Sequence, residues 1–170
     1  MRLKYMGTYD LNPDSLPADP HPPGAVPFRE FKDLKTFSLF ANALSLLILI
    51  PLSLLLLWRS DRIDILQVLW GCVLAMVGIV PHEILHTLFF KGDVYLYTNL
   101  RQGMLFVIGT ESMSKGRFIV MSMLPSLVLG FIPYSAAMIQ PSMTGLGVFG
   151  MMSIMMGAGD FYNVFNAATQ

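Results

Sequence analysis

Four long apolar segments constrain the fold of this 170-residue chain more than any other feature. They cover roughly residues 37–58, 65–90, 117–139 and 146–166, and each reaches the length of about 20 residues that a helix needs to cross a bilayer. Charged residues make up only 13% of the chain, against roughly 25% in ordinary soluble domains. The segments therefore predict an all-α membrane protein, in which a bundle of four transmembrane helices contacts the lipid bilayer.

The distribution of lysine and arginine predicts how this bundle is oriented. Five basic residues precede the first segment, and four lie between the second and third segments or at the start of the third. Two lie in the first short loop, and the third loop has none. Basic residues gather on the cytoplasmic side, so a multi-pass protein is predicted whose N and C termini and 91–116 loop are cytoplasmic. The formal net charge of zero gives no indication of a nucleic-acid partner.

Two regions outside the apolar segments have patterns of their own. Residues 1–35 form a proline-rich N-terminal arm, in which six prolines between positions 13 and 27 oppose helix and favour extended chain. Such an arm is typical of a linker, and less often of a ligand for an aromatic-lined groove. Residues 93–109 contain two β-prone stretches, Val94–Thr98 and Met104–Ile108, on either side of a polar turn. This pattern predicts a small cytoplasmic β-hairpin between the second and third helices.

Four ionisable residues lie well inside the predicted spans: His82, Glu83, His86 and Asp160. Each is costly in hydrocarbon, so each is expected to face protein or water and to have a function. His82 and His86 are four residues apart, so on a helix their imidazoles project from one face and can reach one metal ion. Glu83 projects from an adjacent face, where it can take a proton from water at the metal. This is the H-E-x-x-H pattern.

A catalytic zinc usually has three protein ligands, and Asp160 is the predicted third. Asn163, one turn later, is placed to orient the carboxylate or a substrate. In the predicted spans His82 and Asp160 both lie roughly 9–12 Å from the cytoplasmic end. Small residues share the helical faces of both, which predicts that these faces are packed against other helices: Gly71, Ala75 and Gly78 in line with His82, and Gly150, Ser153 and Gly157 in line with Asp160. No role is assigned to His21.

These motifs resemble a known family. "HEILH" in a membrane helix, then a hairpin, "SKGRFIVMSMLPSLVLG" and "GAGD", are similar to the zincin-like peptidases called domain of unknown function 3267, themselves similar in plan to site-2 intramembrane metalloproteases. The resemblance covers about residues 65–166. It implies a membrane-embedded metalloprotease domain over 36–170, with 37–58 as an accessory helix. Site-2 proteases carry Asn-Pro-Asp-Gly around the third ligand, whereas here Asp160 lies between Gly159 and Phe161.

The resemblance implies one zinc ion per chain, bound by His82, His86 and Asp160, with Glu83 as the catalytic base. The predicted function is therefore a zinc-dependent intramembrane metalloprotease that acts on a membrane-protein or peptide substrate. Two alternatives remain open: a proton- or metal-linked transporter, and a metal-binding protein without catalysis. A purely structural cluster is disfavoured, because polar contacts between membrane helices contribute only about 0.6 kcal/mol on average.

Overall fold

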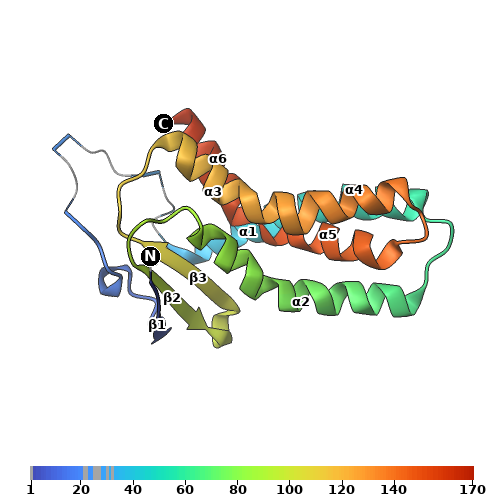
Figure 1. The fold of residues 1–170 in the computed structure, drawn as a ribbon, viewed down its shortest axis with the longest axis horizontal. Coiled ribbons are helices and arrows are strands. Elements are labelled where there is room, and N and C mark those ends of the chain that lie inside the picture. Colours follow the sequence, from blue (N-terminus) through green and yellow to red (C-terminus); the bar gives the residue numbers. More distant parts are fainter. Residues whose placement is uncertain (1, 21–22, 25–27, 30, 32) are drawn as a thin grey trace.

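The chain folds into a bundle of apolar helices with a small sheet at one end (Figure 1). The computed structural model describes residues 2–20, 23–24, 28–29, 31 and 33–170. His21 lies outside the described residues.

Three long helices correspond to the first three predicted spans. They are α1 (Leu34–Arg59), α2 (Ile65–Thr87) and a third helix made of α3 (Lys115–Pro125), the π-helical turn η3 (Ser126–Phe131) and α4 (Ile132–Ile139). Among the described residues these three are long and apolar enough to cross a membrane, as expected of a membrane protein. Each begins at a polar cap, because the side chains of Asp33, Asp64 and Ser114 accept hydrogen bonds from amides of the first turn.

The fourth predicted span, residues 146–166, is divided into two shorter helices. These are α5 (Thr144–Met156) and α6 (Ala158–Thr169), which meet at Gly157. A Cβ atom at Gly157 would collide with the Ser126 hydroxyl of η3, so a larger residue here would require Ser126 to move. The sequence showed a stripe of small residues here but not the break within it. The count of four membrane spans therefore stays a prediction.

The sheet contains the predicted hairpin and one strand that the sequence analysis missed. In the described chain its order is β1 (Leu3–Thr8), β2 (Val94–Asn99), β3 (Met104–Gly109). Strands β2 and β3 pair antiparallel through a turn at η2 (Leu100–Gln102), which confirms the two predicted strands, while their cytoplasmic location stays a prediction. Strand β1 comes from the predicted arm, ahead of its first proline, and pairs parallel with β2. A short helical turn, η1 (Pro13–Ser15), follows it.

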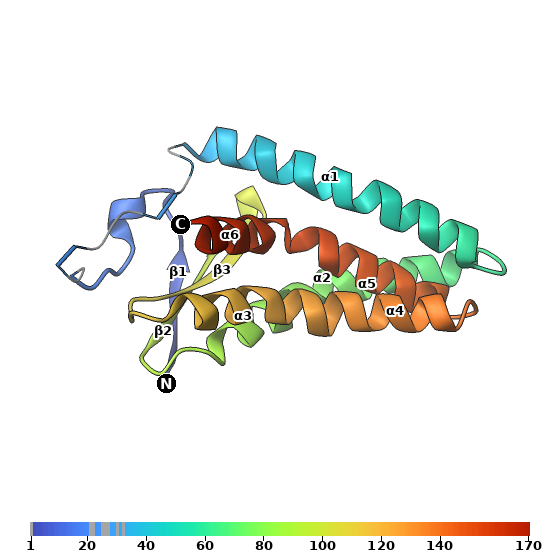
Figure 2. The ribbon, with the colours of Figure 1, turned by 90° about the horizontal axis from the view of Figure 1, so that it is seen from above.

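Helix α5 lies at the centre of the bundle and packs against α1, α2 and α4 (Figure 2). Its apolar side chains join a core cluster of buried residues: Leu56, Tyr134, Ala137, Val148, Met151 and Ile154. The predicted small faces are buried, and glycines bring backbones close together. A Cβ atom at Gly71 would lie 2.5 Å from the Gly145 carbonyl oxygen, and one at Gly150 2.5 Å from the Tyr134 nitrogen.

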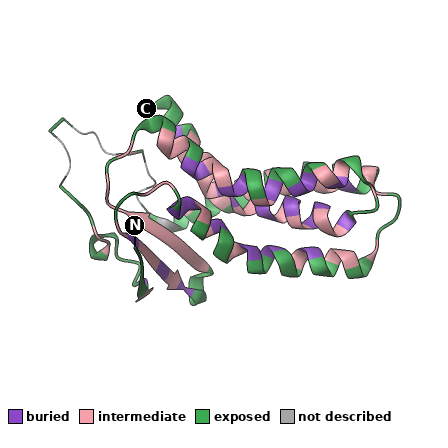
Figure 3. Ribbon diagram, in the orientation of Figure 1, coloured by how far each residue is buried: buried purple, intermediate pink, exposed green. Residues whose placement is uncertain are grey.

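The outward face of α2 is exposed (Figure 3), and the exposed side chains of α1 and α2 are largely apolar. Trp58 is 81% exposed and Met76 is 71% exposed, and many leucines and isoleucines accompany them. Apolar surface of this extent suits a lipid environment, since a soluble protein rarely exposes so much. The three strands and the end of α6 lie together at one end of the bundle (Figures 1 and 2). The assignment of that end to the cytoplasm stays a prediction.

Candidate metal centre

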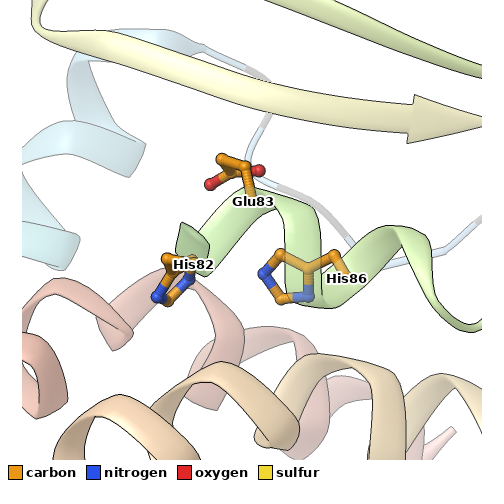
Figure 4. A group of neighbouring side chains, drawn as sticks. All are labelled: His82, Glu83 and His86. Carbon is orange, nitrogen blue, oxygen red and sulfur yellow. The ribbon is translucent and has the colours of Figure 1, made fainter. Parts of the chain in front are cut away.

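The last two turns of α2 carry the three residues of the H-E-x-x-H motif. Both imidazoles are buried, with His82 and His86 each 8% exposed, and their ring centroids are 5.0 Å apart. The two rings lie on one side of the helix, while Glu83 projects to the opposite side (Figure 4). Ligand atoms from all three residues lie within 4.8 Å of one another, so the motif forms a group that could hold a metal ion.

Asp160 reaches this motif from the first turn of α6. Its Oδ2 lies 3.1 Å from His82 Nε2 and its Oδ1 lies 3.5 Å from His86 Nε2. The carboxylate is also close to the helix N-terminus, where the unpaired amides and the helix dipole favour negative charge. The break at Gly157 creates that N-terminus. Residues 78 positions apart in the sequence thus meet at one point.

Further hydrogen bonds fix the orientation of the motif side chains. The Nδ1 atom of His86 lies 3.0 Å from the Met121 carbonyl oxygen of α3. A carbonyl can only accept, so Nδ1 carries a proton. When the imidazole is neutral, its Nε2 keeps the lone pair that a metal ligand needs. On the other side of α2, the Val107 amide of β3 donates to Glu83 Oε2 over 3.1 Å. Neither backbone partner could be recognised from sequence, because each depends on how distant elements pack.

Two carboxylates therefore flank the histidines, and their positions differ. Asp160 contacts both imidazole Nε2 atoms, on the face that the two rings share. Glu83 is turned towards β3 and held there by the Val107 amide. Asp160 is accordingly the better placed of the two to complete a ligand set with the histidines, although Glu83 also lies within reach of them.

A cavity of about 370 Å³, here called the inner cavity, opens beside the motif. Glu83, His86 and Asp160 line it, together with Asn163 and residues 106–109 of β3. Asn163 thus lies where the sequence analysis expected it, one turn beyond Asp160 and facing the same space. A second and larger cavity, the outer cavity, shares Asn163 and residues 106–109 and has a volume of about 880 Å³. The metal centre is therefore open to a groove along β3.

A charged clamp that the sequence analysis missed supports the end of this groove. Glu111 accepts hydrogen bonds from the amides of Lys91 (2.8 Å) and Gly92 (2.6 Å), just after α2. Its second oxygen lies 2.6 Å from Arg117 of α3, which also donates to the Phe89 carbonyl. These contacts, with the Gly92 amide foremost, hold the pKa of Glu111 below its usual range. No motif signals this pairing, because the clamp joins a loop, a helix end and a helix start.

The fold and the site define a class of protein: a mostly helical chain with membrane-length apolar helices and a buried histidine and carboxylate cluster. Comparison with known families is consistent with that class. The family described as "Putative zincin peptidase", domain of unknown function 3267, matches residues 75–170. This is more than half of the chain, which therefore belongs to this family. The family description indicates a zinc metallopeptidase.

The family match includes the motif, the hairpin and all elements from α3 to α6, and it begins within α2. No curated protein and no solved structure matches the chain.

Proposed function

We propose that the chain is a zinc-dependent intramembrane metalloprotease, which hydrolyses peptide bonds in or near the membrane in the manner of site-2 proteases. One observation carries this proposal: Asp160 contacts both imidazoles of the H-E-x-x-H motif. Two histidines and one carboxylate are a ligand set of catalytic zinc, which keeps a fourth position open. The family description, which indicates a zinc metallopeptidase, supports the same reading.

The separations of the donor atoms fit one zinc ion. Zinc bonds to nitrogen and oxygen are about 2.0–2.2 Å long, so neighbouring ligand atoms in a tetrahedral site lie roughly 3.4 Å apart. The two imidazole-to-carboxylate separations are 3.1 Å and 3.5 Å. The Met121 carbonyl also holds the proton of His86 on Nδ1, which leaves Nε2 as the ligand atom. His82, His86 and Asp160 would accordingly hold the metal.

Glu83 would supply the acid and base chemistry. When bound, zinc polarises the scissile carbonyl and lowers the pKa of water towards neutrality. The Glu83 carboxylate would accept a proton from that water and pass it to the leaving amine. The Val107 amide holds one of its oxygens, so the other is available for the proton. Burial of the site keeps bulk water away from these steps.

The groove suits a substrate in extended form. The Val107 amide points away from β2 and towards Glu83, so β3 presents an unpaired edge at the metal centre. An extended peptide could add to that edge, with backbone groups paired to the strand. The other reading of the hairpin is that it only covers the site. Pro125 and Pro133 in the third helix would permit it to bend as a substrate enters.

The metal is tested by elemental analysis of detergent-purified protein. We expect about one zinc ion per wild-type chain and none in His86→Ala. The matched control is His21→Ala, which changes the third histidine of the chain and should keep its zinc. Full zinc content in His86→Ala would refute the ligand assignment. No zinc in the wild type, even after reloading, would favour a proton-linked transporter or an inert cluster instead.

The base is tested by hydrolysis of a membrane-peptide substrate. Glu83→Gln should retain zinc and lose activity by a factor of about 10² to 10⁴, because it removes the proton acceptor and no ligand. Asp160→Asn should weaken zinc binding, since an amide oxygen is a poorer ligand than a carboxylate. Wild-type activity in Glu83→Gln would contradict the role given to Glu83.

A further inference from the structure

The outer cavity has one wall residue from the segment before α1. It runs from residues 106–109 of β3 past Asn163 to Ala167 and Gln170 at the end of α6. Phe28, in the segment before α1, also lines it. Residues 28, 29 and 31 are here called the strap, and the strap contributes Phe28 to the wall of the outer cavity.

Side chains of α6 bind both backbone polar groups of the strap at Arg29. The Arg29 carbonyl accepts hydrogen bonds from the Tyr162 hydroxyl (3.0 Å) and from Asn166 Nδ2 (2.5 Å). The Arg29 amide donates to Gln170 Oε1 over 3.2 Å. Residues 162, 166 and 170 are spaced by four, so they form one stripe along α6. Recognition of this kind depends on the peptide backbone and not on the side chain that it carries.

Aromatic contacts hold the strap on both sides of this backbone site. The ring of Phe28 meets Phe118 of α3 edge to face, with centroids 5.7 Å apart. The ring of Phe31 stacks on Tyr162 at 5.2 Å. Phe28 thus packs against an aromatic ring in the wall of the outer cavity, while the next residue is bound through its backbone. An extended peptide with an apolar side chain would make the same set of contacts.

We propose that Tyr162, Asn166 and Gln170 form a binding site for the backbone of an extended peptide, and that Arg29 of the strap occupies this site in cis. This inference rests on the proposed function in one respect, since it takes the natural ligand to be the substrate. The outer cavity shares residues 106–109 and Asn163 with the inner one, so a peptide bound here lies beside the space that Glu83 and Asp160 line. The substrate class is an extended segment with an apolar residue at the Phe28 position, and it must displace the strap.

Displacement is tested with a single reporter cysteine in the full chain. Ile108 lines both cavities, so Ile108→Cys in a Cys72→Ala background places the reporter in the same cavity wall as Phe28. Adding Phe28→Ala removes one aromatic contact, and we expect maleimide to label the reporter about two to ten times faster. The matched control is Phe165→Ala, an exposed phenylalanine of α6, which should leave the rate unchanged. Equal labelling rates with and without Phe28→Ala would refute the proposal that the strap occupies this site.

Binding is tested in trans with a fluorescein-labelled peptide that has the sequence of residues 24–33, GAVPFREFKD. The receptor is the full chain with Glu83→Gln, which prevents cleavage. Adding Phe28→Ala to the receptor should tighten peptide binding by about two- to tenfold, because the strap competes less. Adding Tyr162→Phe as well should reverse part of that gain, since the peptide loses a hydrogen bond. Unchanged affinity in both receptors would refute the backbone site.

These two readouts do not depend on hydrolysis. A chain that binds zinc and peptide but cleaves nothing would contradict the proposed function and support the strap. A chain that cleaves peptides while its reporter is labelled at the same rate with and without Phe28→Ala would support the proposed function and refute the strap.

Discussion

Gly150 offers a quantitative test of how closely the helices must pack to form the metal centre. A Cβ atom there would lie 2.5 Å from the Tyr134 nitrogen and 2.6 Å from the Gly130 oxygen, whereas ordinary contact begins at 3.4 Å. Both neighbours are backbone atoms and cannot rotate away, so Gly150→Ala must move α5 by nearly 1 Å. Overpacking costs about 1–3 kcal/mol, and alanine recovers about 1 kcal/mol of helix propensity. We expect a net loss of up to about 2 kcal/mol in the free energy of unfolding.

The same displacement should weaken the metal site, because α5 leads directly to Asp160. Metal ligands must be held to within about 0.5 Å, so zinc content should fall together with stability. The assay is SDS titration in mixed micelles, with zinc measured on the same samples. Gly116→Ala is the control, since among the described residues no atom lies within 4 Å of a Cβ placed there. Wild-type stability and zinc content in Gly150→Ala would refute the packing argument.

Three further predictions concern the sheet end of the molecule. Gly103 has a φ of 64°, so Gly103→Ala should cost about 1–2 kcal/mol in an unfolding titration, and Gly103→Asn less. The Gly92 amide holds the pKa of Glu111 below its usual range. That contribution to stability is complete above the ordinary carboxyl pKa and is lost as the pH falls through the lowered pKa. In acid, the free energy of unfolding should therefore fall more steeply with decreasing pH for wild type than for Glu111→Gln. Buried Asn99 donates to the Tyr9 carbonyl over 2.9 Å, so in Asn99→Ala hydrogen exchange should accelerate in β1 and not in α5.

Local patterns in the sequence were sufficient to predict the long helices and the hairpin. An apolar segment in lipid must satisfy its backbone hydrogen bonds internally, which requires a helix. The first three segments were therefore predicted to within a few residues of the observed helices. The strands of the hairpin follow from β-prone residues on either side of a turn that ends at Gly103. The spacing of His82 and His86 predicts a shared helical face, and the structure has both imidazoles on one side of α2.

Features that depend on distant pairing could not be predicted in this way. Strand β1 has six residues with no clear alternation, and it becomes a strand because β2 offers it an edge some 90 residues later. The break at Gly157 has the same origin. A glycine in an apolar stripe is compatible with close helix packing and equally with the end of a helix. At Gly157 the position of Ser126, which is distant in the sequence, decides between these two outcomes.

The break explains why the sequence predicted the position of Asp160 but not what lies beyond it. The predicted depth of Asp160 was counted back from the end of the fourth span at residue 166, and residues 160–166 all lie within α6, beyond the break at Gly157. The count therefore did not cross the break, and Asp160 meets His82 in the structure. The direction of α6 does change, and its effect grows along the helix. The new direction of α6 places Asn166 and Gln170 at the backbone of Arg29. The local sequence pattern does not predict this contact.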